Sequence, residues 1–194
     1  MSRIPSMLAA FAVVIIPVPS AAQSADAQQG LGGPVIQGVC LLSREALFAN
    51  AAVAKAATTR LSELTRAAQT EIDQQRGPLE TEAKALQAQP ANEETTRRRA
   101  ALETRWAALQ RQAAHNSREI DATRTKVMER VTAEAEPVIR QTYTSRKCGL
   151  LLDRSATLGG NFTNDLTAEV ARGLDAKIQT ISFERERLPE EAQP

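Results

Sequence analysis

Between residues 44 and 147 the chain contains almost no helix breakers, and this feature restricts the folds open to it. Glycine and proline occur there only as Gly77, Pro78, Pro90 and Pro137. The other positions are dominated by Ala, Glu, Gln, Arg, Leu and Thr, which are mostly good helix formers. Aromatic side chains are nearly absent, so the segment cannot fill the interior of a compact globular domain. We therefore expect long helices.

The pattern predicts two helices folded back on each other as an antiparallel hairpin over residues 44–147. The tip is expected near residues 87–93, where Pro90 and Asn92 combine a turn signal with a helix-start signal. Arms of roughly 45 and 54 residues, at 1.5 Å per residue, would reach on the order of 65–80 Å. Much of that length must project into solvent or pack against the partner arm.

A proline inside a helix removes a backbone hydrogen bond and clashes with the preceding turn. Gly77 and Pro78 lie in the outer half of the first arm and are predicted to form an arm hinge. Pro137 is expected to bend the returning arm near its base in the same way.

Apolar residues recur at steps of three and four along both arms, which is the coiled-coil pattern. In the first arm the predicted seam is Leu61, Leu64, Ala68, Gln75, Leu79 and Leu86. In the second arm it is Leu102, Trp106, Leu109, Ala113, Ile120 and Val127, with Asn116 and Thr123 in the intervening slots. Polar residues and alanines stand where a stable coiled coil has Leu or Ile, so the arms are expected to pair loosely.

The first 22 residues have the pattern of a secretory signal peptide. Arg3 supplies the positive region, residues 7–16 an apolar stretch, and Ser20 and Ala22 the small residues before a cleavage site near Ala22. The apolar stretch is short for a transmembrane helix, which needs about 20 residues; an uncleaved membrane anchor is the alternative. The mature chain is therefore expected to be exported, with residues 23–34 as a flexible, Gly-rich leader.

The rest of the chain predicts a small body at the base of the hairpin. Residues 35–43 and 148–154 are apolar runs typical of buried strands, and residues 164–178 have the periodicity of an amphipathic helix. Together, segments 35–43 and 148–178 are too small for an independent core, so oligomerisation is expected to supply the missing burial. The fold class is α-dominated (α+β), and the charged tail, 179–194, is expected to be disordered.

The two cysteines, Cys40 and Cys148, stand at opposite ends of the hairpin. Export permits a disulfide between them, which would close a loop of about 108 residues. Two buried free thiols are the alternative, because cysteine is often a small core residue.

A series of arginines in the second arm is the strongest candidate for a binding surface. Steps of six or seven keep side chains on roughly one side of a helix and could present them to acidic segments or lipid phosphates. The alternative is a solvated flank paired with Glu103, Glu119 and Asp121. Trp106 is either a seam residue or an aromatic contact for a bound client. The arginines of the series are Arg97, Arg98, Arg99, Arg105, Arg111, Arg118 and Arg124.

Motifs typical of enzymes are missing from the sequence. There is one histidine, no nucleophile motif, no Gly-rich phosphate loop and no zinc-ligand spacing, and the acidic residues are spread over helix faces. We expect no enzyme activity, no cofactor, no metal site and no nucleic-acid partner.

Three pieces in this order resemble the Skp/OmpH family of periplasmic chaperones. They are VCLLSREALF at residues 39–48, the long polar hairpin, and CGLLLDRSATLGGNFTNDLTAEVARGL at residues 148–174. The last includes a strand that ends in Asp153 and the triplet Asp165-Leu166-Thr167 ahead of the final helix. The resemblance covers about residues 35–178 and also places both cysteines near the starts of neighbouring strands.

The resemblance implies a homotrimer whose strands join in a central body and whose arms enclose a cavity. Its expected clients are unfolded outer-membrane β-barrel proteins, which an ATP-independent holdase would keep soluble during transit. Contact with lipopolysaccharide or an anionic membrane surface is also implied, without assignment to particular residues. This chain is close to neutral, with a formal net charge of +1, whereas many members are strongly basic. A coiled-coil adaptor of the envelope that binds one folded partner is the competing hypothesis.

Overall fold

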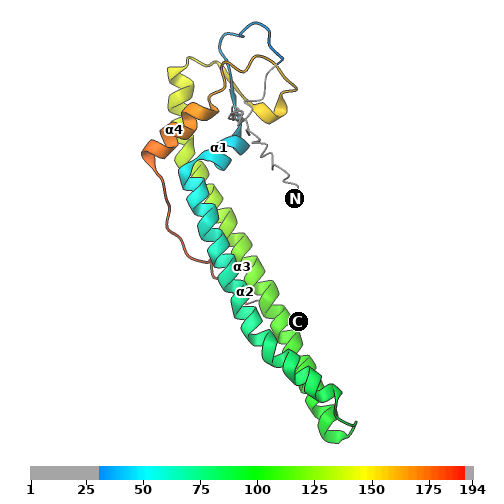
Figure 1. Ribbon diagram of the computed structural model, residues 1–194. Coiled ribbons are helices and arrows are strands. Elements are labelled where there is room, and N and C mark those ends of the chain that lie inside the picture. The colour runs from blue at the N-terminus through cyan, green and yellow to red at the C-terminus, as the bar shows by residue number, and fades with distance from the viewer. Residues whose placement is uncertain (1–30, 191–194) are drawn as a thin grey trace, which may run out of the picture.

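The computed structural model describes residues 31–190; the predicted signal peptide, 1–22, and most of the predicted leader, 23–34, lie outside this range. A long helical hairpin projects from a small body that holds the two strands of the described chain (Figure 1). The predicted α-dominated (α+β) fold class is confirmed. The elements in order are β1 (Val39–Leu42), α1 (Arg44–Asn50), α2 (Ala52–Gln87), α3 (Glu93–Ser145), β2 (Leu150–Asp153), the 3₁₀ helix η1 (Arg154–Ala156) and α4 (Thr167–Lys177).

The turn between α2 and α3 is fixed by a capping box at Asn92. The Asn92 side chain accepts from the Thr95 N–H at 2.8 Å, and the Thr95 hydroxyl accepts from the Asn92 N–H at 2.9 Å. Two of the donors that a helix start leaves without partners are thereby satisfied. Arg99 donates across the turn to the Leu86 carbonyl at the end of α2 and to the Gln89 carbonyl just beyond it. The turn is therefore held by side chains from the cap and the first turns of α3.

Apolar residues at the outer part of the hairpin form a separate cluster of Ile72, Leu79, Leu86, Leu102 and Leu109. The predicted seam is wrong at Gln75, which is exposed, while Ile72 is buried in its place. The buried stripe of α2 advances four residues from Ala68 to Ile72 before it resumes steps of seven. A helix of 3.6 residues per turn drifts away from a strict seven-residue step, and this shorter step corrects the drift.

The body is built on two parallel strands. Val39 of β1 lies opposite Leu150 of β2, and Leu42 lies opposite Asp153. Parallel strands need a long crossover connection, and here the whole hairpin is that connection. The other edge of β1 is also covered, because Leu41 exchanges backbone hydrogen bonds with Asn164 and Leu166. Within the described residues, the outer edge of β2 has no strand partner.

The first arm was expected to begin at residue 44, but the structure separates a short helix, α1, from the arm helix α2. Ala51 between them is extended, with φ −61° and ψ 134°, and is fully buried. The start of α2 is capped by Asp175 of α4, whose carboxylate accepts from the Ala52 N–H at 2.7 Å. The break depends on a residue far away in sequence, and no local breaker marks it.

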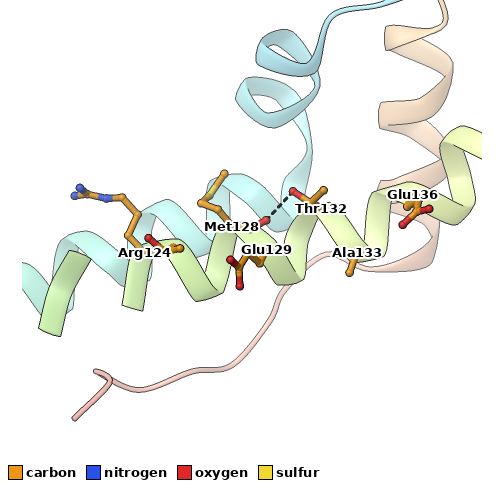
Figure 2. A pocket seen from close by; sticks show the side chains of 7 residues that line it. Arg124, Met128, Glu129, Thr132, Ala133 and Glu136 are labelled. Atoms are coloured by element: carbon orange, nitrogen blue, oxygen red, sulfur yellow. Dashed lines mark hydrogen bonds between the residues drawn. The ribbon is translucent and has the colours of Figure 1, made fainter. Parts of the chain in front are cut away.

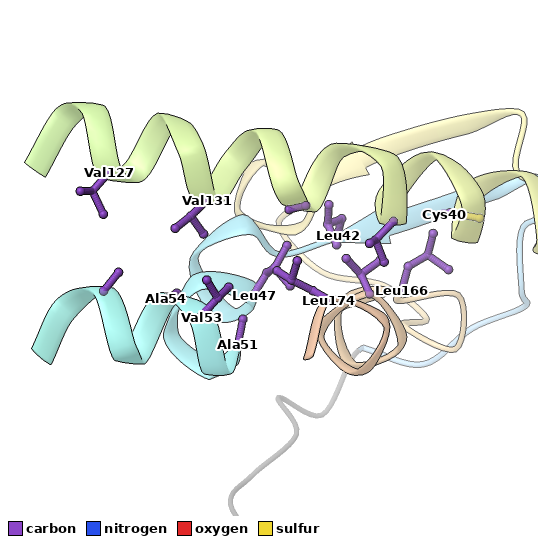
Figure 3. Packing of buried hydrophobic residues seen from close by; sticks show 14 of the residues in the cluster. Cys40, Leu42, Leu47, Ala51, Val53, Ala54, Val127, Val131, Leu166 and Leu174 are labelled. Carbon is purple, nitrogen blue, oxygen red and sulfur yellow. The ribbon is translucent and has the colours of Figure 1, made fainter. Parts of the chain in front are cut away.

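The main core lies where the body meets the base of the hairpin (Figure 3). Leu47, Val53, Val131, Val170 and Leu174 are completely buried there. They come from α1, α2, α3 and α4, so each of these helices contributes to one core. Burying a side chain of this size stabilises a protein by about 1.5–3 kcal/mol. The arm is thus anchored firmly at its base.

The tail was expected to be disordered, and for residues 179–190 this prediction is wrong. They leave α4 and run along the hairpin (Figure 1). Ile181 and Phe183 pack against the main core, and Arg185 pairs with acidic residues of both arms. The charges of the tail have specific partners on the hairpin, which composition alone does not reveal. Residues 191–194 lie outside the described range.

Candidate functional site

The predicted arginine series lies along α3, and most of it pairs within the hairpin. Arg97 pairs with Glu93 and Glu94, and Arg105 with Glu82 of α2 at 2.5 Å. Pairs this exposed contribute little stability. The remaining contacts are Arg124 with Asp121 at 3.3 Å, Arg118 with His115 Nδ1 at 3.5 Å, and Arg99 with the carbonyls at the turn.

Two arginines of the series have no ion pair or hydrogen-bond partner among the described residues. Arg98 is half-buried and Arg111 is exposed, and both lie on the outer part of α3. They are the members of the series best able to meet an acidic segment or a phosphate. The other arginines of the series stay candidates for such contacts, but each would first have to give up its partner within the arm.

Trp106 is half-buried and packs against the outer apolar cluster. Part of the ring is therefore a seam contact, while the rest faces solvent and is available to a bound chain.

Helix α2 runs without interruption through Gly77 and Pro78, and the Thr81 hydroxyl donates to the Gly77 carbonyl at 3.0 Å. The hinge at these two residues stays a prediction.

Cys40 and Cys148 are joined as a disulfide, with their Cα atoms 5.8 Å apart. Cys40 begins the buried part of β1, and Cys148 follows the end of α3. The bond therefore connects the start of the sheet to the base of the returning arm.

At the end of β2, the Ser155 hydroxyl and Arg44 donate to Asp153 and lower the pKa of that carboxyl to about 2.

No group of residues suited to a metal ion occurs in the described part of the chain. A shallow hollow of about 580 Å³ lies beside Arg124, Met128, Glu129 and Thr132 (Figure 2). All of its lining residues belong to the single helix α3, and no convergent polar groups give it a ligand chemistry. None of the helices between residues 31 and 190 carries an apolar stretch long enough to span a membrane.

The exposed apolar surface of the described chain is concentrated on the body. Leu150 and Leu152 of β2 are 50% and 36% exposed, and Ile36 is 67% exposed. Leu152 and Ile36 also line a hollow of about 150 Å³ together with Val39 and Leu41. An exposed apolar patch next to an open strand edge is typical of a surface that associates with another chain.

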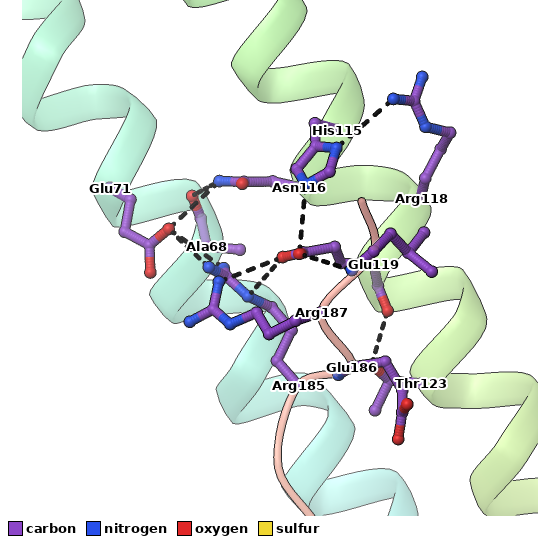
Figure 4. A network of polar contacts seen from close by, with 11 residues as sticks. Ala68, Glu71, His115, Asn116, Arg118, Glu119, Thr123, Arg185, Glu186 and Arg187 are labelled. Carbon is purple, nitrogen blue, oxygen red and sulfur yellow. Dashed lines mark hydrogen bonds and ion pairs between the residues drawn. The ribbon is translucent and has the colours of Figure 1, made fainter. Parts of the chain in front are cut away.

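A buried polar network in the middle of the hairpin joins the two arms to the tail (Figure 4). At its centre, the Glu119 side chain is only 2% exposed. Its carboxylate lies 3.1 Å from Arg185 Nε, 3.3 Å from Arg187 Nη1 and 3.2 Å from His115 Nε2. A buried charge is tolerated when it is paired and hydrogen-bonded, and this one meets both conditions.

Sequence reasoning identified the polar slots of this network but missed their partner. Asn116 and Thr123 were expected as weak points of the seam, and Glu119 was considered only as a partner of the arginines on a solvated flank. Instead, Asn116 contacts the Ala68 carbonyl and Glu71, and the Thr123 hydroxyl accepts from the Glu186 N–H. The available signal was the alternation of Glu and Arg in the tail, FERER, opposite polar seam positions.

Comparisons with known proteins agree with this architecture. The family model described as outer membrane protein (OmpH-like) matches residues 38–174. A crystal structure of a candidate outer membrane chaperone (OmpH-like) from Caulobacter crescentus CB15 is 36% identical, with a TM-score of 0.76. The match covers 84% of this chain and 98% of that one. A search of curated proteins gave no match.

The family match spans β1, both arms and most of α4, so it includes the body and the hairpin together. The similar crystal structure shares the fold over 98% of its own chain. Its 36% sequence identity is high enough to indicate a common family as well as a common fold. The chain belongs to the OmpH-like family of periplasmic outer-membrane chaperones.

Proposed function

We propose that this protein is an ATP-independent holdase that keeps unfolded outer-membrane β-barrel proteins soluble in the periplasm. The observation that carries the proposal is a long hairpin anchored beside an open strand edge with exposed Leu150 and Leu152. Association of bodies through that edge, as a homotrimer, would place several arms around one client. The arms would then act together.

Holding an unfolded chain without ATP requires contacts that are weak, numerous and reversible. Several arms around one client raise the effective concentration of each contact, so no single strong site is needed. The outer half of the arm suits this role, because it is rich in alanine and charged residues and has few large apolar side chains on its surface. Such a surface offers short apolar patches without a large one that would aggregate.

Arg98, Arg111 and the exposed part of Trp106 are the proposed client contacts on the outer arm. The two arginines have no partner between residues 31 and 190, so they can meet client carboxylates or lipopolysaccharide phosphates without first breaking a contact. The other arginines of the series would contribute after exchange of their surface pairs, which are weak. A hinge at Gly77 and Pro78 would let the arms adapt to clients of different size.

The test is dilution of a urea-unfolded outer-membrane porin into buffer with the mature protein present or absent. We expect suppressed light scattering at about one trimer per client. Arg98→Ala with Arg111→Ala should weaken suppression. Arg140→Ala with Arg172→Ala is the matched control, because it removes two exposed arginines that lie outside the series. Unchanged turbidity, together with co-purification of one folded envelope protein, would instead support the adaptor hypothesis.

A further inference from the structure

The tail lies against polar side chains of the hairpin that would be costly to bury without hydrogen-bond partners. Asn116, Glu119 and Thr123 lie in the seam and are 7%, 2% and 1% exposed. At such positions a coiled coil normally has apolar side chains, and polar ones weaken pairing. We refer to these three residues, with Glu71 of α2, as the polar seat.

The tail supplies most of the partners of the polar seat. Arg185 donates to Glu119 and also to Glu71 at 3.0 Å, and its own side chain is only 10% exposed. If the tail left, Glu119 would retain only His115 among the contacts found in residues 31–190. The 2% exposure of Glu119 holds with the tail in place, and a charge buried without partners is strongly destabilised. Any chain segment that covers the seat must therefore bring a cation, as the tail does.

The seat also recognises extended backbone. The Glu186 N–H donates to the Thr123 hydroxyl at 2.9 Å, and the Leu188 N–H donates to Glu119 at 3.1 Å. Further toward the base, Arg130 donates to the Ser182 carbonyl at 3.1 Å. Backbone groups are the same in every sequence, so these bonds do not select a sequence. The selective contact in the seat is the Arg185 side chain, while Ile181 and Phe183 add apolar contacts to the main core.

We propose that the polar seat is a binding site for extended polypeptide segments that carry an arginine, and that the tail is its built-in competitor. The proposal rests on the proposed function, because the segments it assigns are those of unfolded clients. The flanking pairs of the tail, Arg60 with Glu184 and Lys126 with Glu186, have exposed members and add little. A client segment with arginine at the right place can therefore replace the tail.

The test uses a fluorescent peptide with the sequence of residues 180–190 and the full mature chain. Arg185→Ala should free the seat and bind the peptide at least about tenfold more tightly than wild type, because hydrogen bonds to charged groups contribute about 1.5–3 kcal/mol. A peptide with alanine in place of Arg185 should not bind. Adding Glu119→Gln to Arg185→Ala should abolish the gain.

A different result is expected if the tail only stabilises the hairpin and the polar seat binds no other segment. In that case the peptide fails to bind Arg185→Ala although circular dichroism shows a folded protein, and this overturns the proposal. Leu188→Pro, which removes the N–H donor to Glu119 without changing the hairpin, gives a second route to a released tail. It should raise peptide affinity above wild type but less than Arg185→Ala does, because Arg185 still pairs with Glu119 and Glu71.

Competition separates this proposal from the holdase itself. Unfolded porin should displace the peptide from Arg185→Ala, and failure to displace it overturns the assignment to clients. If porin aggregation is suppressed while the peptide does not bind, the holdase stands and the seat is wrong. If the peptide binds and porin still aggregates, the seat stands for arginine-bearing segments and the holdase is wrong.

Discussion

Polar side chains in the seam of the hairpin have roles that depend on their partners. Thr123 and Asn116 reduce the apolar contact between the arms, and in sequence they indicate only a loose pairing. In the structure they form part of a hydrogen-bonded network that also holds Glu119. A buried polar group is costly when unpaired and nearly neutral when satisfied. Residue type alone therefore does not decide whether the seam is weak.

The capping box at the hairpin tip should make a measurable contribution to stability. Asn92→Ala removes the side-chain acceptor for the Thr95 N–H, and we expect a loss of about 1 kcal/mol in the free energy of unfolding. Urea denaturation followed by circular dichroism measures it. Thr104→Ala is the matched control, because Thr104 is exposed and bonds only within its own helix. Equal effects of the two substitutions would contradict the role of the cap.

The carboxyl of Asp153 should make stability depend on pH at the acidic end. Its pKa is lowered from 3.8 to about 2, chiefly by the Ser155 hydroxyl and then by Arg44. A group with a lowered folded-state pKa stabilises the fold above its unfolded value and loses this effect as pH falls through the folded value. The difference in melting temperature between wild type and Asp153→Asn should be constant above pH 5 and shrink between about pH 4 and pH 2. A difference that is the same at pH 2 and pH 7 would rule the contribution out.

At the scale of elements, the sequence predicted the helices of the hairpin well because their signals are local. Helix formers, the absence of breakers and the capping residue Asn92 all lie within the helices they specify. The break at Ala51 was missed because its cap, Asp175, comes from α4. The docked tail was missed for the same reason: the partner of Arg185 is Glu119 of α3, which is far away in the sequence. Of the candidate site, the arginine series was visible in sequence, but its partners and the polar seat were not.

The disulfide should stabilise the chain mainly by restricting its unfolded state. The bonded cysteines are 108 residues apart, for which the chain-entropy model gives about 4–5 kcal/mol. Cys40→Ala with Cys148→Ala should lower the free energy of unfolding by up to that amount and remove any effect of reductant. Wild type refolded from urea with reductant should match the variant. Two freely alkylated thiols in protein taken from the periplasm would show that the bond does not form there.

The hinge can be tested by changing the proline inside α2. Pro78→Ala restores a backbone hydrogen bond and removes a clash, so we expect a more stable arm by about 1–3 kcal/mol. Distances between spin labels at the tip and the base should also become more narrowly distributed. Gln75→Ala, an exposed substitution in the same helix, is the control. An unchanged distance distribution in Pro78→Ala would end the hinge hypothesis.

At the scale of the whole molecule, the hairpin is both the arm proposed to bind clients and the connection between the two strands of the sheet. The chain passes from β1 through α1 into the hairpin, and it continues from the hairpin into β2 shortly after Cys148. The body cannot form its parallel strand pair unless the arms return to the same place. Arm and body should therefore fold together, with the main core at their junction as the shared centre.

The last prediction concerns assembly. The open edge of β2 carries Leu150 and Leu152 on the exposed surface, and a strand edge with apolar side chains readily pairs with another chain. Multi-angle light scattering should give a trimer for the mature protein at micromolar concentration. Leu150→Asp with Leu152→Asp should yield smaller species, because charges would be buried without partners in the interface. Ala107→Asp, on the exposed surface of the arm, should leave the trimer intact. A wild-type monomer at this concentration would refute the trimer, and a trimer that survives the double substitution would move the interface away from β2.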